Sequence, residues 1–156
     1  MEVSGMGRRQ MHRCAGLVLA ALIAWPLLPV RADVAAQAAP VYAVSPIGWV
    51  RKDAGKTWIE VEPRYQPALL GVDELRSLWV LYWFDRNDTP EKRAMLQVHP
   101  RGNPENPLRG VFATRSPFRP NLIAQSQVRV IAVRGNVIEI DDIDAWADTP
   151  VLDLKP

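Results

Sequence analysis

The sequence predicts an all-β or β-rich fold, a single small β-barrel domain with one or two short helical turns. Apolar or alternating segments of strand length recur along the chain, separated by loops rich in proline, asparagine and glycine. The sequence shows neither a strand-helix-strand period nor a glycine-rich dinucleotide fingerprint, which disfavours a doubly wound α/β fold. With 156 residues, 48% hydrophobic and 23% charged, the chain can bury the core of one domain.

Residues 1–32 form a separate segment. Arginines precede a nearly unbroken apolar run from Cys14 to Val30, and small residues follow it. This arrangement is typical of a signal peptide, so we expect an apolar helix that is either cleaved or kept as an N-terminal anchor. Cleavage implies a periplasmic or secreted protein. In either case we expect contact with the membrane only through this segment. An anchor or a misassigned start implies a cytoplasmic domain.

The alanine-rich stretch 33–43 is interpreted as a linker before a barrel domain at 44–156. Residues 33–156 hold 15 Lys and Arg against 16 Asp and Glu, so the formal charge falls from +2 for the whole chain to −1. The basic character belongs to the leader and by itself does not indicate nucleic-acid binding. Six arginines lie in 99–134 and six acidic residues in 139–153, and we expect these two segments to face one another.

The domain has few residues suited to metal binding or thiol chemistry. Cys14 in the leader is the only cysteine, so the domain has no disulfide and no cysteine nucleophile. His99 has no second histidine in the domain with which to share a metal ion. We therefore expect no metal site.

Two strands and a helical turn are expected first. Apolar residues alternate or cluster over 47–51 and over 57–61, and a short loop separates the two segments. Prolines break regular structure over 63–67. Over 68–77 the apolar residues recur at the spacing of one or two helical turns with an inward face.

The segment LWVLYWF, from Leu78 to Phe84, is the most apolar part of the domain. Its length and aromatic content favour a strand that is buried on both faces or that closes a barrel. Trp79, Tyr82, Trp83 and Phe84 are therefore core residues by default, and a base-stacking role for one of them is the alternative.

The rest of the chain is expected to consist of strands joined by turns. Residues 95–99 form a short strand before a loop with several prolines. Residues 127–133 and 137–143 both alternate, and Arg134-Gly135-Asn136 joins them as a β-hairpin. Residues 151–154 are the last expected strand.

The segment with the most site-like chemistry begins at Gly110. Residues 110–113 are an apolar run of strand length, so the polar residues behind them are expected at a strand end, where sites tend to lie. Two prolines restrict the following loop, and Arg109, Arg115 and Arg119 can address a carboxylate, a phosphate or a stacked ring. A solvated turn whose arginines pair with acidic residues elsewhere is the alternative.

The sequence GVFATRSPFRPN at 110–121, with HPRGNPENPLR before it and DTPVLDLKP at the end of the chain, resembles the TsaA-like family, also called TrmO-like. The resemblance covers about Ile47 to Pro156. It implies a small β-barrel methyltransferase that depends on S-adenosyl-L-methionine. It also implies a homodimer that acts on the threonylcarbamoyl-modified adenosine beside the anticodon of tRNA.

The resemblance further implies a cofactor site. Arg115 matches the arginine of the family's ATRS motif. The other implied cofactor-binding residues are Asp85, Arg86, Gln125, Asp144, Ala145, Trp146 and Ala147. The implied substrate-binding residues are Arg109, Arg119 and Asn121. Asp144 can bond ribose hydroxyls, as acids do in other nucleotide sites, and an exposed strand-end carboxylate is the alternative.

Several positions depart from the family pattern. The family's PRQ segment after the first strand is missing between Lys52 and Lys56, and Asp85 stands where the family has a histidine. The family's LDGTP is replaced by WADTP, residues 146–150. Two interpretations follow: an S-adenosyl-L-methionine-dependent methyltransferase, and an exported, catalytically diverged binding or interaction module. A methyltransferase with another acceptor lies between them.

Overall fold

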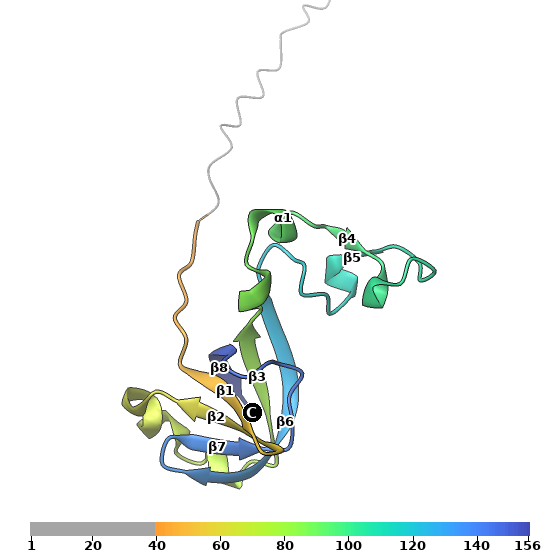
Figure 1. The fold of residues 1–156 in the computed structure, drawn as a ribbon. Coiled ribbons are helices and arrows are strands. Elements are labelled where there is room, and N and C mark those ends of the chain that lie inside the picture. Colours follow the sequence, from red (N-terminus) through yellow and green to blue (C-terminus); the bar gives the residue numbers. More distant parts are fainter. Residues whose placement is uncertain (1–39) are drawn as a thin grey trace, which may run out of the picture. The chain divides into compact units, whose positions relative to one another are not determined.

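The computed structural model describes residues 40–156, and in residues 41–156 a β-barrel carries a long projecting arm (Figure 1). We call residues 85–122 the arm. The predicted signal helix or anchor at 1–32 and most of the linker at 33–43 lie outside the described residues. No helix in the described part is long and apolar enough to cross a membrane.

Six antiparallel strands close the barrel in the order β1-β2-β7-β6-β3-β8, which confirms the predicted barrel. The strands are β1 (Gly48–Asp53), β2 (Lys56–Val61), β3 (Ser77–Trp83), β6 (Ile123–Arg134), β7 (Val137–Ile140) and β8 (Pro150–Lys155). Closure leaves no free edge strand in this sheet, because every strand pairs with a neighbour on both sides.

The barrel interior is filled by one face of every strand. Branched aliphatic side chains dominate it, because they fit a pleated surface and are stiff. The fully inaccessible ones are Val50, Ile59, Val80, Ile138 and Val151. Burying each such side chain contributes about 1.5 to 3 kcal/mol before conformational entropy is counted.

Strand β3 shows the predicted alternation. Leu78, Val80 and Tyr82 are buried, and the residues between them are half-buried on the outer face. The strand therefore closes a barrel with one fully buried face. The default assignment of its aromatic residues to the core is confirmed for Tyr82 and for Phe84, which follows the strand and packs on the core. It is wrong for Trp79 and Trp83, because the period of the strand places both tryptophans on its outer face.

Short 3-10 helices replace the helical turns expected over 68–77. They are η1 (Pro63–Leu69) and η2 (Val72–Glu74), so helical structure begins already in the proline segment that was expected to be irregular. Pro63 suits the start of a helix because its missing N–H would have no partner there. Leu69 is buried, and Val72 and Leu75 pack on the same core as predicted.

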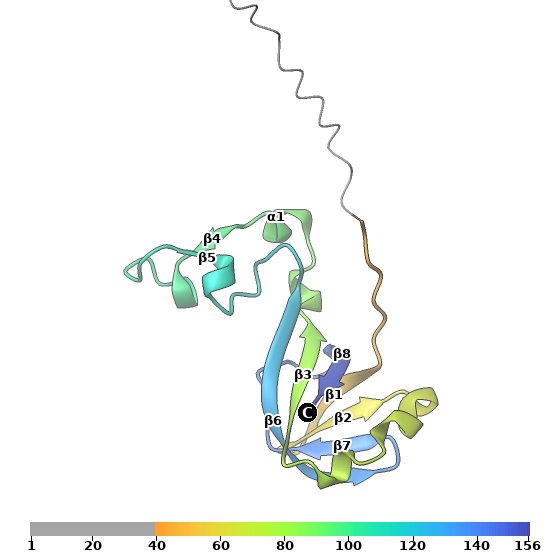
Figure 2. The ribbon, with the colours of Figure 1, turned by 180° about the vertical axis from the view of Figure 1, so that it is seen from behind.

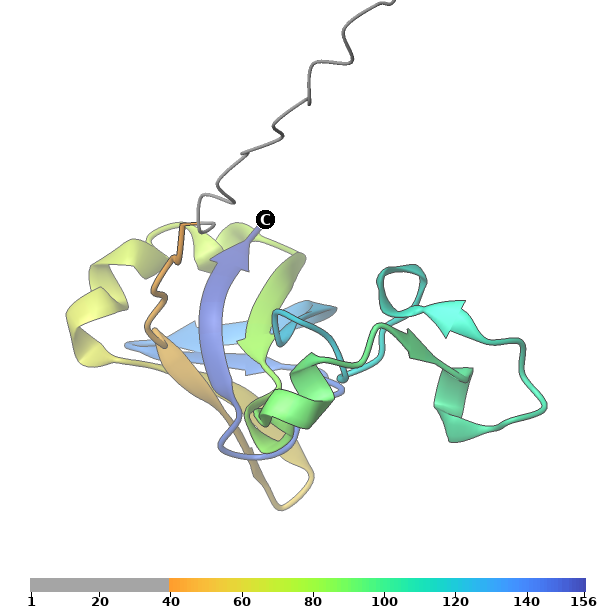
Figure 3. The ribbon, with the colours of Figure 1, turned by 90° about the horizontal axis from the view of Figure 1, so that it is seen from above.

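The arm consists of short elements in two legs, and it extends away from the barrel in the rear and top views (Figures 2 and 3). The elements are η3 (Asp85–Asn87), α1 (Pro90–Arg93), β4 (Gln97–Val98), η4 (Pro100–Gly102), β5 (Arg109–Gly110) and η5 (Val111–Ala113). Strands β4 and β5 form a separate two-stranded sheet, so the strand expected at 95–99 exists but is shorter.

The prediction of a strand over residues 110–113 is wrong. Only Gly110 belongs to a strand, and Val111 to Ala113 form the 3-10 turn η5. Thr114 closes this turn, because its backbone N–H and its hydroxyl both donate to the carbonyl oxygen of Val111, at 3.1 and 3.0 Å. Of the three residues in this turn only Val111 is buried, and the side chain of Phe112 is 79% exposed.

The predicted β-hairpin of the C-terminal part is confirmed. Strand β6 begins at Ile123 rather than 127, and β7 ends at Ile140 rather than 143. Gly135 takes the positive φ of 60° that the tight turn requires. The segment 141–149 between β7 and β8, which we call the 141–149 loop, is irregular.

The predicted pairing of the basic and acidic segments holds in part. Arg134 pairs with Glu139 at 2.9 Å, and Arg129 lies 3.8 Å from Asp141. The other pairs of the acidic segment lead elsewhere, because Asp142 and Asp148 pair with Lys52 and Arg51 of β1. Of the six arginines in the arm, those at 101, 109, 115 and 119 form no ion pair within residues 40–156.

Candidate functional site

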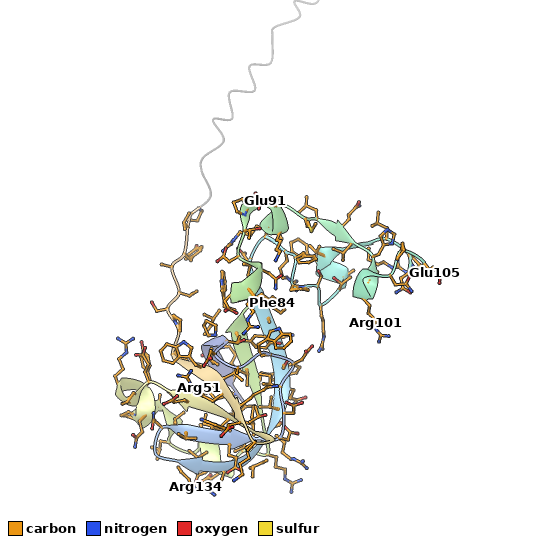
Figure 4. The ribbon with its side chains drawn as sticks, in the orientation of Figure 1. Arg51, Phe84, Glu91, Arg101, Glu105 and Arg134 are labelled. Atoms are coloured by element: carbon orange, nitrogen blue, oxygen red, sulfur yellow. The ribbon has the colours of Figure 1, made fainter. Side chains whose placement is uncertain are left out.

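A pocket of about 210 Å³ opens where the arm leaves the barrel. Three segments line it: residues 82–87 at the end of β3, Pro117 on the returning leg of the arm, and residues 144–146 with Thr149 from the 141–149 loop. Figure 4 shows Phe84 at this junction, with Arg101 and Glu105 at the far end of the arm and Arg134 at the opposite end of the barrel. The pocket thus unites chain segments that are far apart in sequence.

The end of β3 explains why polar side chains lie at this pocket. The backbone N–H of Phe84 donates to Leu122 at 2.8 Å, and the N–H of Asn87 then donates back to Phe84 at 2.9 Å. These two bonds end the strand and turn the chain into η3. Asp85 and Arg86 in that turn are exposed at the pocket.

Tyr82 forms the floor of the pocket. Its hydroxyl donates to the backbone carbonyl of Asp144 at 2.7 Å and lies 3.3 Å from the hydroxyl oxygen of Ser126. Burial raises the pKa of the Tyr82 phenol, the hydrogen bond with Ser126 lowers it, and the charges of Asp144 and Arg115 act in opposite directions. Tyr82 is therefore a neutral donor at physiological pH.

Aromatic surface faces the pocket beside these polar groups. The ring of Phe84 meets that of Tyr82 edge-on, with centroids 5.8 Å apart and planes at 74°. Trp146 is 69% exposed, and the guanidinium carbon of Arg86 lies 5.1 Å from its ring centroid. A cation over an exposed indole leaves one flat face on which a planar ligand can stack.

The root of the arm is fixed beside the pocket by Arg93 of α1. Its Nε donates to Asp88 at 2.7 Å and its Nη1 donates to the carbonyl of Pro120 at 3.0 Å, so one side chain joins both legs. The indole N–H of Trp83 also donates to Asp88, at 3.2 Å, and Arg93 lies 5.3 Å from the Trp83 ring centroid. Trp83 therefore connects the barrel to the arm.

The structure brings five of the predicted cofactor-binding residues together at the pocket. They are Asp85, Arg86, Asp144, Ala145 and Trp146. Ala147 lies in the same loop without lining the pocket. Arg115 is exposed on the returning leg, two residues before Pro117. Gln125 is exposed on β6 opposite Leu81, on the outer face of the barrel and away from the pocket lining. Cofactor binding by these residues stays a prediction.

The predicted substrate-binding residues lie on the arm and beside its root. Arg109 is in β5, and Arg119 and Asn121 are on the returning leg. Arg109 and Asn121 are exposed, Arg119 is half-buried, and none of the three lines the pocket.

Sequence reasoning did not assign several pocket residues. Tyr82 and Phe84 were interpreted as core, although Tyr82 carries the only side-chain hydroxyl among residues 78–84. Pro117 and Thr149 lie within the segments that carried the family resemblance, which was the available signal. Thr149 is buried, and its backbone N–H donates to the backbone carbonyl of Trp146 at 3.4 Å.

The fold and the pocket together define a class: small β-barrel proteins with a mixed polar and aromatic pocket at the root of a basic arm. Within residues 40–156 no cluster of histidine, cysteine and acidic residues could hold a metal ion. Such a pocket suits an organic ligand with a flat ring and charged groups.

The sequence model of the tRNA-methyltransferase O N-terminal domain matches residues 44–156. The chain therefore belongs to this family, which confirms the predicted family.

Relatives in other organisms agree. A probable S-adenosyl-L-methionine-binding protein of Pyrococcus horikoshii is 47% identical over 114 residues, which cover 73% of this chain and 81% of the relative. A protein of Methanocaldococcus jannaschii with the same description is 44% identical, over 74% of this chain and 91% of the relative. The tRNA (adenine(37)-N6)-methyltransferase of Mus musculus is 37% identical over 57% of this chain, but only 20% of that protein is covered.

A crystal structure of TrmO from Pseudomonas aeruginosa has the same fold, with a TM-score of 0.56 and 28% identity over 75% of this chain. The match covers 56% of that structure, so this chain spans about half the length of the solved TrmO chain. The cofactor and the enzyme class implied by the sequence are those that the relatives' descriptions print.

Proposed function

We propose that the protein binds S-adenosyl-L-methionine in the pocket at the root of the arm and transfers its methyl group to N6 of adenosine 37 in tRNA. The observation that carries the proposal is that Asp85, Arg86 and Asp144 line the same pocket as the exposed ring of Trp146 in a member of this family. The descriptions of the archaeal relatives support the cofactor, and that of the mouse relative supports the acceptor.

The residues present fit the cofactor's chemistry. The carboxylates of Asp85 and Asp144 suit ribose hydroxyls or the positive charge of a sulfonium or ammonium group. Trp146 suits the adenine ring, and Arg115 suits the methionine carboxylate. When bound, the cofactor supplies an electrophilic methyl group on sulfur. No side chain is assigned as a catalytic base.

What the chain itself contributes is orientation. The rings of Tyr82 and Phe84 pack edge-on at the bottom of the pocket. The hydrogen bond from the Tyr82 hydroxyl to the backbone carbonyl of Asp144 fixes the position of the opposite wall. Holding two reactants in a near-attack geometry supplies much of the rate of a group transfer. We propose this as the main catalytic contribution.

The arm is proposed to meet the tRNA. Its arginines at 101, 109, 115 and 119 have no ion-pair partner within residues 40–156, so they are available to phosphates. Arg109, Arg119 and Asn121 are the proposed contacts to the acceptor nucleotide and its neighbours. The patch is local, since residues 33–156 carry a formal charge of only −1.

A homodimer is proposed because one chain offers an incomplete pocket. The pocket's 210 Å³ is smaller than the roughly 300 to 1,000 Å³ that enclose a ligand of this size. The arm also exposes the apolar side chains Met95, Leu96, Leu108 and Phe112. A second copy that covers these residues would remove their apolar surface from water.

An exported, catalytically diverged binding module is the second candidate. The arginines and the apolar run from Cys14 to Val30 favour it, as does Asp85 in place of the family's histidine. Cofactor and tRNA are both scarce outside the cytoplasm, so an exported domain would have exchanged catalysis for binding.

One pair of measurements separates the two candidates. We expect calorimetric titration to show stoichiometric S-adenosyl-L-methionine binding, and labelled methyl groups to appear in tRNA that lacks this modification. The contrary result is a periplasmic chain that begins near Asp33 and ignores the cofactor. Fractionation with a tag after Pro156, together with the N-terminal mass, determines which chain was assayed.

A further inference from the structure

We propose that Arg51 and Lys52 of β1 are positioning residues for the cofactor pocket, although neither side chain lines it. Together they hold both ends of the 141–149 loop, whose central residues form one wall of the pocket. The inference rests on the proposed function for its meaning, but the restraint on the loop can be measured without any cofactor.

The end of the loop is held at Asp148. This residue has a φ of 66°, in the left-handed region, and its backbone N–H donates to Val50 of β1 at 2.7 Å. Aspartate tolerates this conformation better than most residues but less well than glycine. The Nη1 of Arg51 donates to the carboxylate of Asp148, and this ion pair offsets part of the conformational cost.

The start of the loop is held by Lys52. Its Nζ donates to the carboxylate of Asp142 at 3.1 Å and to the backbone carbonyl of Ile143 at 2.8 Å. Ile143 is itself buried in the barrel core, so the lysine acts on a segment that is already packed on one side. The pKa of Asp142 is lowered, first by the backbone N–H of Ile143 and then by Lys52.

Arg51 is fixed in place before it meets the loop. Its Nε donates to Glu60 of β2 at 2.7 Å, and its guanidinium carbon lies 5.7 Å from the ring centroid of Trp49. Its side chain is only 32% exposed. A guanidinium held by one carboxylate and one ring presents its remaining donors in a fixed direction, so little entropy is lost when Asp148 binds.

Between the two anchors lie the residues that form the wall, from Asp144 to Trp146. The hydrogen bond from Tyr82 to Asp144 restrains this stretch directly. Arg51 and Lys52 restrain it through the flanking residues Asp148 and Ile143. Exposed ion pairs are screened by salt. The order of the pocket wall therefore depends on ionic strength, independently of any charge on the ligand.

The test is hydrogen exchange of the full chain without cofactor, together with titration of S-adenosyl-L-methionine. In Arg51→Ala we expect the amides of residues 144–149, Asp148 above all, to exchange about twofold to fivefold faster at low salt. The dissociation constant should rise by a similar factor. Both effects should shrink in 0.5 M salt, at which the Debye length falls to roughly 4 Å. The matched control is Arg134→Ala, which breaks an exposed ion pair at the other end of the barrel.

A double mutant makes the test decisive. Asp148→Gly accepts the positive φ without a partner, so adding Arg51→Ala to that variant should change neither exchange nor affinity further. Arg51→Ala that behaves as wild type, or that has the same effect in the Asp148→Gly background, would overturn the inference. If the wild-type chain does not bind the cofactor at all, the proposed function fails, and the exchange data still decide whether Arg51 restrains the loop.

Discussion

The hydroxyl of Tyr82, on the inward face of β3, donates a 2.7 Å hydrogen bond to the backbone carbonyl of Asp144, 62 residues further along the chain. The most apolar strand of the barrel and an irregular loop are thereby connected through one buried oxygen. The pocket floor and the pocket wall consequently cannot move independently.

Tyr82→Phe tests this connection, because it removes the hydroxyl and keeps the ring. A neutral hydrogen bond contributes about 0.5 to 1.5 kcal/mol, and the carbonyl left behind adds to the cost if water does not reach it. We expect a loss of this size in the free energy of unfolding, measured in urea. Tyr42→Phe is the control, since Tyr42 is 83% exposed. Equal unfolding midpoints for Tyr82→Phe and wild type would show that the bond contributes nothing.

Arg115→Ala tests the charged end of the proposed cofactor site. Loss of a charge-assisted hydrogen bond should weaken S-adenosyl-L-methionine binding by about 1.5 to 3 kcal/mol, as measured by calorimetry. Arg101→Ala removes the same charge at the far end of the arm and should leave the affinity unchanged. An unaltered affinity in folded Arg115→Ala would remove this arginine from the site.

Trp146→Ala separates binding from stability. The side chain is 69% exposed, so we expect the free energy of unfolding to change by less than about 0.5 kcal/mol. Stacking of an adenine on an aromatic ring is worth about 1 to 3 kcal/mol, and the cofactor affinity should fall by that amount. Trp146→Phe should retain most of it. A large loss of stability would instead assign the ring to packing.

Phe112→Asp tests the proposed homodimer. Phe112 is 79% exposed on the arm, and a carboxylate there should oppose burial against a second copy. We expect wild type to dimerise and Phe112→Asp to be monomeric by light scattering over a range of concentrations. Leu70→Asp, at a 95% exposed position outside the arm, is the matched control. A monomeric wild type, or a dimer that persists in Phe112→Asp, contradicts the proposal.

Local sequence patterns predicted the barrel strands well. The hairpin of β6 and β7 follows from alternation on both sides of Gly135, and β3 follows from seven apolar residues that end in a charged loop. In both cases the deciding interaction is the burial of one face of the element itself. Such a signal lies entirely within the segment.

The errors lie where a short segment is compatible with two structures. Residues 110–113 have the composition of a strand, but the hydroxyl of Thr114 bonds back to Val111 and closes a 3-10 turn. The proline segment at 63–67 was expected to be irregular, although Pro63 is favourable at the start of η1. Single side-chain hydrogen bonds and helix starts decide these cases, and periodicity does not report them.

The site was predicted only in part, because most of its geometry is non-local. The family resemblance indicated Asp144 to Trp146, and the structure places these residues at the pocket. No pattern within a segment could indicate that Arg51 meets Asp148, 97 residues away. The positive φ at Asp148 follows from how the loop rejoins β8, and its one signal in the sequence is that the family's LDGTP has glycine at this position.

The ladder between β1 and β8 is short, because these strands pair only at Gly48 with Val151 and at Trp49 with Pro150. Strands β3 and β6, in contrast, pair along the whole length of β3. The pairing between β1 and β8 should therefore be the first strand pairing of the closed sheet to be lost on heating. The 141–149 loop joins β8 directly at this pairing. A ligand that binds to the loop would consequently stabilise the closed barrel. The melting temperature should therefore rise with cofactor concentration, as mass action requires.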